Sequence, residues 1–214
     1  SAPRGEDKVY ARPGEATLAH RGVLFLDGLP EFSRESLEGL REPLEDGTVR
    51  LPRHGVTLPA RFTLVGAMLP CPCGYAGDGS DRCECSPDRI ARYRSRVTGP
   101  IMAHFDLRVK LATTPRGAAP SGDTSAEVRT RVVVARDRQK ARQGKLNAEM
   151  TVDNCPGTSG AWRTALAEMD RLGVGSQAKR RIVMVARTIA DLAGSDAVTS
   201  AHVHEAAVLH GAID

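Results

Sequence analysis

Hydrophobic residues follow two different patterns along this chain. In the first part, short apolar runs at 23–26 and within 61–68 have the length of β-strands. The run 23–26 lacks the alternation of a half-exposed strand, which predicts a strand buried on both faces, as in a parallel sheet. After it, Ser33 is placed to cap a helix, and Pro43 should bend or end that helix early.

Two further elements are predicted in the first part, a β-hairpin and a last strand. Alternating residues at 49–51 and 56–58 flank a Pro-Arg-His-Gly tip and predict a β-hairpin that carries Arg50, Arg53 and His54. Alternation of Phe105, Leu107 and Val109 predicts a last strand. A solvated turn is the plain alternative for the hairpin tip.

Beyond residue 124 the apolar spacing becomes that of α-helices. Thr124 and Glu127 form a capping-box pair ahead of the first helix. The residues expected on the buried sides of the four helices are Val128, Val132 and Ala135; Trp162, Ala165, Leu166, Met169 and Leu172; Ile182, Val185, Ile189 and Leu192; and Val203, Ala206 and Ala207. Together the patterns predict an α/β part over 1–112, a Pro- and Gly-rich linker over 113–123 and a helical domain over 124–214.

Composition narrows the class of protein. The 214 residues are 26% charged and 41% hydrophobic, with a net charge of +4 that permits contact with nucleic acid without demanding it. No apolar run approaches the roughly 18 residues that a membrane span needs, and the N-terminus has no apolar signal-like stretch. We therefore expect a cytoplasmic protein without a membrane partner.

The first strand ends at Asp27. Ligands of open α/β sheets gather beyond the carboxyl ends of the strands, so a carboxylate there suits a Mg²⁺ held against nucleotide phosphates. An acidic turn residue after a core strand is the alternative.

Four of the five cysteines fall within fifteen residues, as the two Cys-x-Cys pairs Cys71, Cys73 and Cys83, Cys85. Four thiolates form a closed tetrahedral set for a structural Zn²⁺. Reduced buried thiols and a redox pair are the alternatives.

Ordered landmarks along nearly the whole chain resemble the magnesium-chelatase-like AAA+ ATPases of the ComM/YifB type, from the Walker B region through the lid. The landmarks are Pro13-Gly14-Glu15, Leu18-Ala19-His20, residues 21–32, residues 42–47, Cys71-Pro72-Cys73-Gly74-Tyr75, Ala91-Arg92-Tyr93-Arg94, Gly99-Pro100 and residues 186–192. The resemblance implies a partial AAA+ parallel-sheet core with a β-hairpin insertion and an all-helical lid. It also implies ATP with Mg²⁺ at Asp27, a homo-oligomeric ring, a hexamer by family, and DNA contact through the hairpin.

Four positions depart from the family pattern. Gly28 replaces the Walker B glutamate that polarises the attacking water, and Leu69 replaces an asparagine that orients it. His104 stands at the arginine finger. Gln177 stands at a lid arginine that reaches the γ-phosphate, with residues 179–181 close behind as substitutes.

Two functions from different classes fit these observations. The first is a fragment or degenerate member of an ATPase that remodels DNA, as in branch migration. The second is a non-hydrolysing zinc-containing module for assembly or DNA binding. A positioned base contributes about 10²–10⁴ in rate and an arginine finger about 10³–10⁵. Since the sequence also contains no Gly-x-x-x-x-Gly-Lys-Ser/Thr phosphate loop, weak or absent hydrolysis is expected for these 214 residues.

Overall fold

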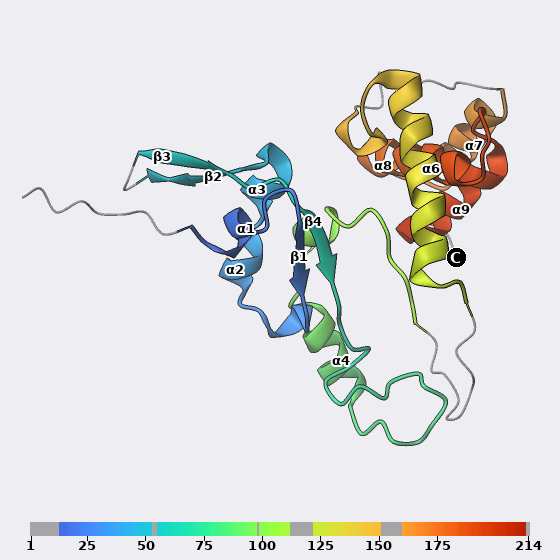
Figure 1. Ribbon diagram of the computed structural model, residues 1–214. Coiled ribbons are helices and arrows are strands. Elements are labelled where there is room, and N and C mark those ends of the chain that lie inside the picture. The colour runs from blue at the N-terminus through green and yellow to red at the C-terminus, as the bar shows by residue number, and fades with distance from the viewer. Residues whose placement is uncertain (1–12, 53–54, 98, 112–121, 151–159, 213–214) are drawn as a thin grey trace, which may run out of the picture. The chain divides into compact units, whose positions relative to one another are not determined.

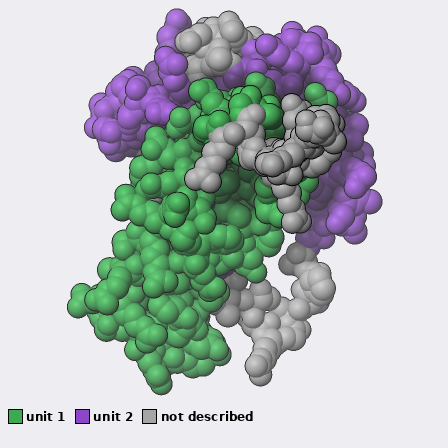
Figure 2. All heavy atoms as spheres, turned by 90° about the vertical axis from the view of Figure 1, so that its left-hand side faces the viewer, with its two compact units in different colours: residues 1–104 green, residues 105–214 purple. Residues whose placement is uncertain are grey.

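The structure is a computed structural model that describes residues 13–52, 55–97, 99–111, 122–150 and 160–212. The chain divides into two compact units, residues 1–104 and 105–214 (Figures 1 and 2). The division falls earlier than the expected domain boundary at 112, and most of the expected linker lies outside the described residues.

Unit 1 combines short helices with two small sheets (Figure 1). Its elements are α1 (Glu15–Leu18), β1 (Val23–Leu26), the 3₁₀ turn η1 (Leu29–Glu31), α2 (Arg34–Glu38), α3 (Arg41–Asp46), β2 (Thr48–Leu51), β3 (Val56–Pro59), β4 (Thr63–Gly66), α4 (Pro87–Arg94) and α5 (Gly99–Met102).

The central feature of unit 1 is the parallel pair β1 and β4, which runs from Val23 opposite Thr63 to Leu26 opposite Gly66. The parallel strand predicted over 23–26 is therefore confirmed. Its burial on both faces is wrong, because Val23 is 61% and Phe25 58% exposed while Leu26 is buried. The described sheet has two strands, and within the described part of the chain no element covers the side chains of Val23 and Phe25.

The helical segment after β1 is divided into α2 and α3. Ser33 caps α2 by accepting a hydrogen bond from the N–H of Ser36 at 3.1 Å. Pro43, in the first turn of α3, cannot donate to the carbonyl of Gly39 four residues earlier and would clash with it in a continuous helix. The predicted bend is thus present, one turn ahead of the proline.

The predicted hairpin is also present, as β2 paired antiparallel with β3 from Thr48 opposite Pro59 to Leu51 opposite Val56. Gly47 enters it with a φ of +69°, and its carbonyl accepts a hydrogen bond from Ala60 at 2.8 Å. An added Cβ at Gly47 would lie 2.5 Å from Cγ of Arg61. The turn that leads into the hairpin therefore requires glycine at position 47.

Unit 2 is helical, with α6 (Ser125–Gln143), the 3₁₀ turn η3 (Asn147–Glu149), α7 (Gly160–Arg171), α8 (Ser176–Leu192) and α9 (Ser200–His210). The Thr124 and Glu127 capping box is formed as predicted. The core consists of Met169, Ile182, Val183, Ala186, Ala190, Val198, Val203, Ala206 and Ala207.

Several predicted core positions in unit 2 are wrong. Val128 and Val132 are each 41% exposed, because only the C-terminal half of α6, at Ala135 and Gln139, is buried. Leu172 and Leu192 are exposed at the ends of their helices.

The strand predicted at Phe105, Leu107 and Val109 is absent from the described residues 103–111, which form no strand. Alternation alone cannot make a strand without a hydrogen-bonding partner. The segment is instead held as an extended arm within unit 2, where the N–H of Arg108 donates to the carbonyl of Leu209 at 2.6 Å.

Candidate functional site

Four cysteine thiols gather in the loop between β4 and α4. Cys71 is buried, and Cys73, Cys83 and Cys85 are partly buried free thiols. The Sγ atoms of Cys71, Cys73 and Cys83 lie 3.3, 3.8 and 3.7 Å apart, and all four Sγ atoms lie within 4.8 Å of one another. Sulfurs at the corners of a tetrahedron with metal–sulfur bonds of about 2.3 Å would be about 3.8 Å apart. The cluster therefore has the donors and the spacing to hold a metal ion.

The loop that carries the thiols is ordered by its own contacts. The N–H of Ala76 donates to Sγ of Cys71 at 3.3 Å, a bond that favours the thiolate. Between the cysteine pairs, Arg82 donates to Asp78 at 2.7 Å and its guanidinium lies 4.2 Å from the ring centre of Tyr75. These contacts fold the loop back, so that Cys83 and Cys85 lie beside Cys71 and Cys73.

The thiols differ in how easily they ionise. Burial alone would raise the pKa of Cys71, but hydrogen bonds from Cys73 and the Ala76 N–H outweigh it and lower the pKa to about 6. The Cys85 N–H acts to lower the pKa of Cys83, yet burial and the neighbouring thiols raise that pKa to about 11. One thiolate thus suppresses the ionisation of its neighbours, and a bound cation would remove that repulsion.

The carboxyl end of β1 places Asp27 and Gly28 beside the end of β4. Asp27 is exposed, and its carboxylate makes no hydrogen bond or ion pair within the described part of the chain. Gly28 has a φ of +71°, and a Cβ built on it would lie 3.2 Å from Cδ of Glu31 and 3.5 Å from both of its carboxylate oxygens. The Glu31 carboxylate therefore lies directly against the point at which a side chain at position 28 would begin.

The other substituted family positions are not gathered there by any described contact. Leu69 follows β4, is 53% exposed and has no polar group to orient water. His104 is 11% exposed, and its Nε2 lies 3.5 Å from Oε1 of Glu45, inside unit 1. Gln177 is exposed in the first turn of α8 in unit 2. Behind it, Lys179 and Arg181 already pair with carboxylates, Lys179 with Asp170 and Arg181 with Asp106 at 2.7 Å.

Of the three basic residues predicted on the hairpin, the structure describes Arg50, and its guanidinium is already paired. Arg50 lies on β2 with its Nε 3.0 Å from Glu42 and its Nη2 3.8 Å from Asp46, both on α3. Arg53 and His54 lie outside the described residues.

A buried polar network in unit 2 was not assigned a role from the sequence, although two of its members belong to the 186–192 landmark. Asp191 accepts hydrogen bonds from Arg142 at 2.6 and 2.9 Å, from Arg187 at 2.8 Å and from Asn147 at 2.9 Å. Arg187 and Asp191 are 0% and 1% exposed. Burial alone would raise the pKa of Asp191, but these hydrogen bonds outweigh it and lower the pKa. Charged residues four apart on an otherwise apolar helix face were the available signal.

These features define a class of protein. A parallel strand pair that ends in an acidic residue, a hairpin between its strands and a helical unit that follows form a partial AAA+ core with a helical lid.

Comparison with known proteins gives the family. The models described as magnesium chelatase subunit ChlI and magnesium chelatase subunit ChlI C-terminal match residues 5–119 and 122–210. The chain belongs to this magnesium-chelatase-like family.

Similar proteins include YifB of Escherichia coli, 42% identical over 94% of this chain and 41% of its own length. The competence protein ComM of Haemophilus influenzae is 40% identical over 91% of this chain and 40% of its length. The chain thus spans about two fifths of these relatives. Among the described residues, no helix combines the length and apolar character that a membrane crossing requires.

Proposed function

We propose that this chain is the Walker B and lid portion of a magnesium-chelatase-like AAA+ ATPase that remodels DNA, and that its hydrolysis of ATP is weak or lost. The family supports ATP with Mg²⁺ as the ligand. The carboxylate of Asp27, which is exposed and has no partner among the described residues, supports Mg²⁺ at the end of β1.

The observation that carries the loss of hydrolysis is the backbone and surroundings of Gly28. A general base must reach the attacking water, and glycine offers no group to do so. The atoms nearest to the missing Cβ of Gly28 belong to the Glu31 carboxylate, which lies beside the place of the absent side chain. Leu69, which follows β4 in the chain, has no polar side-chain atom to orient water either.

Phosphate release by the full-length gene product, with and without DNA, tests this proposal. We expect turnover no higher than that of an Asp27→Ala variant, which removes the metal ligand. DNA-stimulated turnover well above this control would contradict the proposal. If such turnover were lost in Glu31→Gln but kept in Glu35→Gln, the carboxylate of Glu31 would be the general base. Glu31 would then have taken over the role of the glutamate that Gly28 replaces.

A second candidate function, favoured by the thiol geometry, is that of a zinc-containing module. We propose that Cys71, Cys73, Cys83 and Cys85 hold a structural Zn²⁺, since four thiolates close the coordination sphere and leave no position for a substrate. The metal would fix the segment that links β4 to α4. Arg94 of α4 already donates to the carbonyl of Pro70 beside the first cysteine at 3.1 Å.

Elemental analysis of protein purified without chelator tests the metal. We expect about one zinc per chain, lost in a Cys71→Ser, Cys83→Ser double variant and kept in the matched Cys155→Ser variant, which removes a thiol distant in sequence from the four. Wild-type protein without zinc would contradict the assignment. If two of the four cysteines had instead formed a disulfide during purification, a thiol titration would find two fewer free thiols.

We further propose that the chain acts in a homo-oligomeric ring and that the hairpin β2–β3 contacts DNA. The support is the family and the basic tip of the hairpin. Because Arg50 is paired with Glu42 and Asp46, it would need to exchange these partners for a phosphate. Sedimentation of the full-length product with ATP tests the ring, and a monomer at all concentrations would contradict it.

A further inference from the structure

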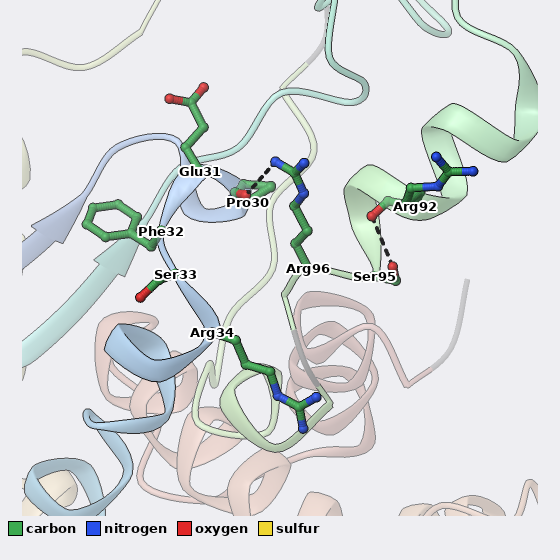
Figure 3. Close-up of a pocket in the computed structure, with 8 residues that line it drawn as sticks. All are labelled: Pro30, Glu31, Phe32, Ser33, Arg34, Arg92, Ser95 and Arg96. Atoms are coloured by element: carbon green, nitrogen blue, oxygen red, sulfur yellow. Dashed lines mark hydrogen bonds between the residues drawn. The ribbon is translucent and has the colours of Figure 1, made fainter.

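The end of α4 contacts both loops that follow the paired strands of unit 1. After β4 the chain passes through Pro70 into the cysteine cluster, and Nε of Arg94 donates to the Pro70 carbonyl at 3.1 Å. After β1 the chain turns through η1, and Nη1 of Arg96 donates to the Pro30 carbonyl at 3.4 Å, the contact drawn in Figure 3. Two arginines of one short segment therefore connect the cysteine loop with the turn that begins at Asp27.

Buried residues fix this segment and the loops that it contacts. Tyr93 and Val97, which flank the two arginines, are each 8% exposed. On the side of the loops, Cys71 and Leu29 are 0% and 3% exposed. Because packed interiors are stiff and transmit strain, a shift of the end of α4 would disturb both carbonyl contacts.

The turn after Asp27 is otherwise held by backbone hydrogen bonds. The N–H of Leu29 donates to the carbonyl of Ala67, just after β4, at 2.9 Å, and the N–H of Glu31 donates to the carbonyl of Gly28 at 2.7 Å. Arg96 adds a side-chain donor from a segment 66 residues further along the chain. This donor holds the turn from outside, and the backbone of the turn sets the direction of its two carboxylates.

The cysteine loop is the part of this arrangement that a metal ion would stiffen. Four thiolates bound to one cation would join residues 71–85 into a closed loop. Cys71 directly follows Pro70, so a metal on its Sγ would also fix the carbonyl to which Arg94 donates. Without metal, the loop retains the Ala76 N–H bond to Cys71 and the contacts of Arg82.

We propose that Arg96 is a positioning residue for the turn over residues 27–31 and that zinc in the cysteine cluster acts through α4 to hold it there. Loss of zinc would free the Pro70 carbonyl from Arg94, and the end of α4 would carry Arg96 away from Pro30. The Asp27 carboxylate would then lose its fixed direction toward Mg²⁺. This inference rests on the proposed function, which supplies both metals, and adds that the two sites are coupled.

Hydrogen–deuterium exchange of the full-length gene product tests the role of Arg96, with the backbone amides of residues 28–32 as the readout. Arg96→Met removes the donors and keeps an unbranched side chain, whereas Arg96→Lys restores one donor. We expect Arg96→Met to speed exchange of these amides roughly fivefold, as for one lost hydrogen bond, and Arg96→Lys to recover most of the protection. Arg89→Met is the matched control, because Arg89 is exposed on α4 and its side chain has no partner among the described residues.

Removal of zinc with a chelator, followed by its return, tests the coupling. In wild type, exchange of residues 28–32 should speed up by about the same factor on removal and recover when zinc is returned. In Arg96→Met, removal should add little, since the contact is already lost. Coupling between binding sites is reciprocal, so ATP with Mg²⁺ should tighten zinc binding in wild type but not in Arg96→Met.

Each part of the inference has a result that would overturn it. Exchange in Arg96→Met equal to that in Arg89→Met would remove the positioning role. Exchange of residues 28–32 that does not respond to bound zinc would remove the coupling, and wild type purified without zinc would remove the zinc site and the coupling together. If exchange responds as expected but ATP binds no variant, the proposed nucleotide function is wrong and the coupling stands. Unchanged exchange in α8 would show that each variant is folded.

Discussion

Replacement of Asp191 by asparagine should destabilise unit 2 far more than its conservative size suggests. The change keeps the shape of the side chain but removes the charge that Arg142, Arg187 and Asn147 contact. The side chain of Arg142 is 23% exposed and can turn toward water, whereas that of Arg187 is 1% exposed and cannot. An arginine left buried without its carboxylate costs about 3–5 kcal/mol of unfolding free energy.

This cost can be measured by following the single tryptophan, Trp162, which lies in α7 and therefore reports on unit 2. For a unit of this size, a loss of about 3 kcal/mol lowers the melting temperature by about 12 °C or more. Asp196→Asn is the matched control, because its side chain is exposed and its pair with Arg138 contributes about 0–1 kcal/mol. If Asp191→Asn lost no more stability than Asp196→Asn, the network would not stabilise the unit as we infer.

The lowered pKa of Asp191 also fixes the sign of its pH dependence. A carboxylate whose pKa is lower in the folded protein stabilises the fold fully above its unfolded pKa, about 3.9. That contribution is lost as the pH falls through the lower folded value. The difference in stability between wild type and Asp191→Asn should therefore stay constant from about pH 5 to 8 and shrink only below about pH 4. A difference that changed near pH 6 would point to another group.

Three further predictions concern single positions. Thr124→Ala should cost about 1 kcal/mol, because the capping box with Glu127 is lost, and Thr124→Ser should restore most of it in thermal unfolding. Gly47→Ala should cost about 1–3 kcal/mol, since its φ is +69° and the new Cβ would meet Arg61; an unchanged melting temperature would contradict this. Asp27→Ala should leave the free energy of unfolding within about 0.5 kcal/mol, as the side chain is exposed and has no partner in the described part of the chain. It should nevertheless remove Mg²⁺-dependent nucleotide binding in calorimetry of the full-length product.

Features set by local sequence were predicted well. The strand 23–26, the Ser33 and Thr124 caps and the hairpin at 48–59 depend on residues close together in the chain, so spacing and residue type were sufficient. The four cysteines were also recognised by spacing, since two short pairs in one loop can meet without help from distant elements.

Features that depend on distant partners were missed. Burial of Arg187 and Asp191 requires Arg142 and Asn147, which lie far back in the chain, to supply donors. The strand expected at 105–109 had the right alternation but no described strand to pair with.

One face of the β1–β4 pair is exposed to solvent, and this should make unit 1 less stable than unit 2. Two strands with Val23, Phe25 and Val65 facing solvent form a ribbon of marginal stability, and each strand has an outer edge without a described partner. Unit 2, in contrast, encloses a continuous apolar core. Heating should therefore melt unit 1 first, and its newly freed strands should seed aggregation while the helical bundle is still intact.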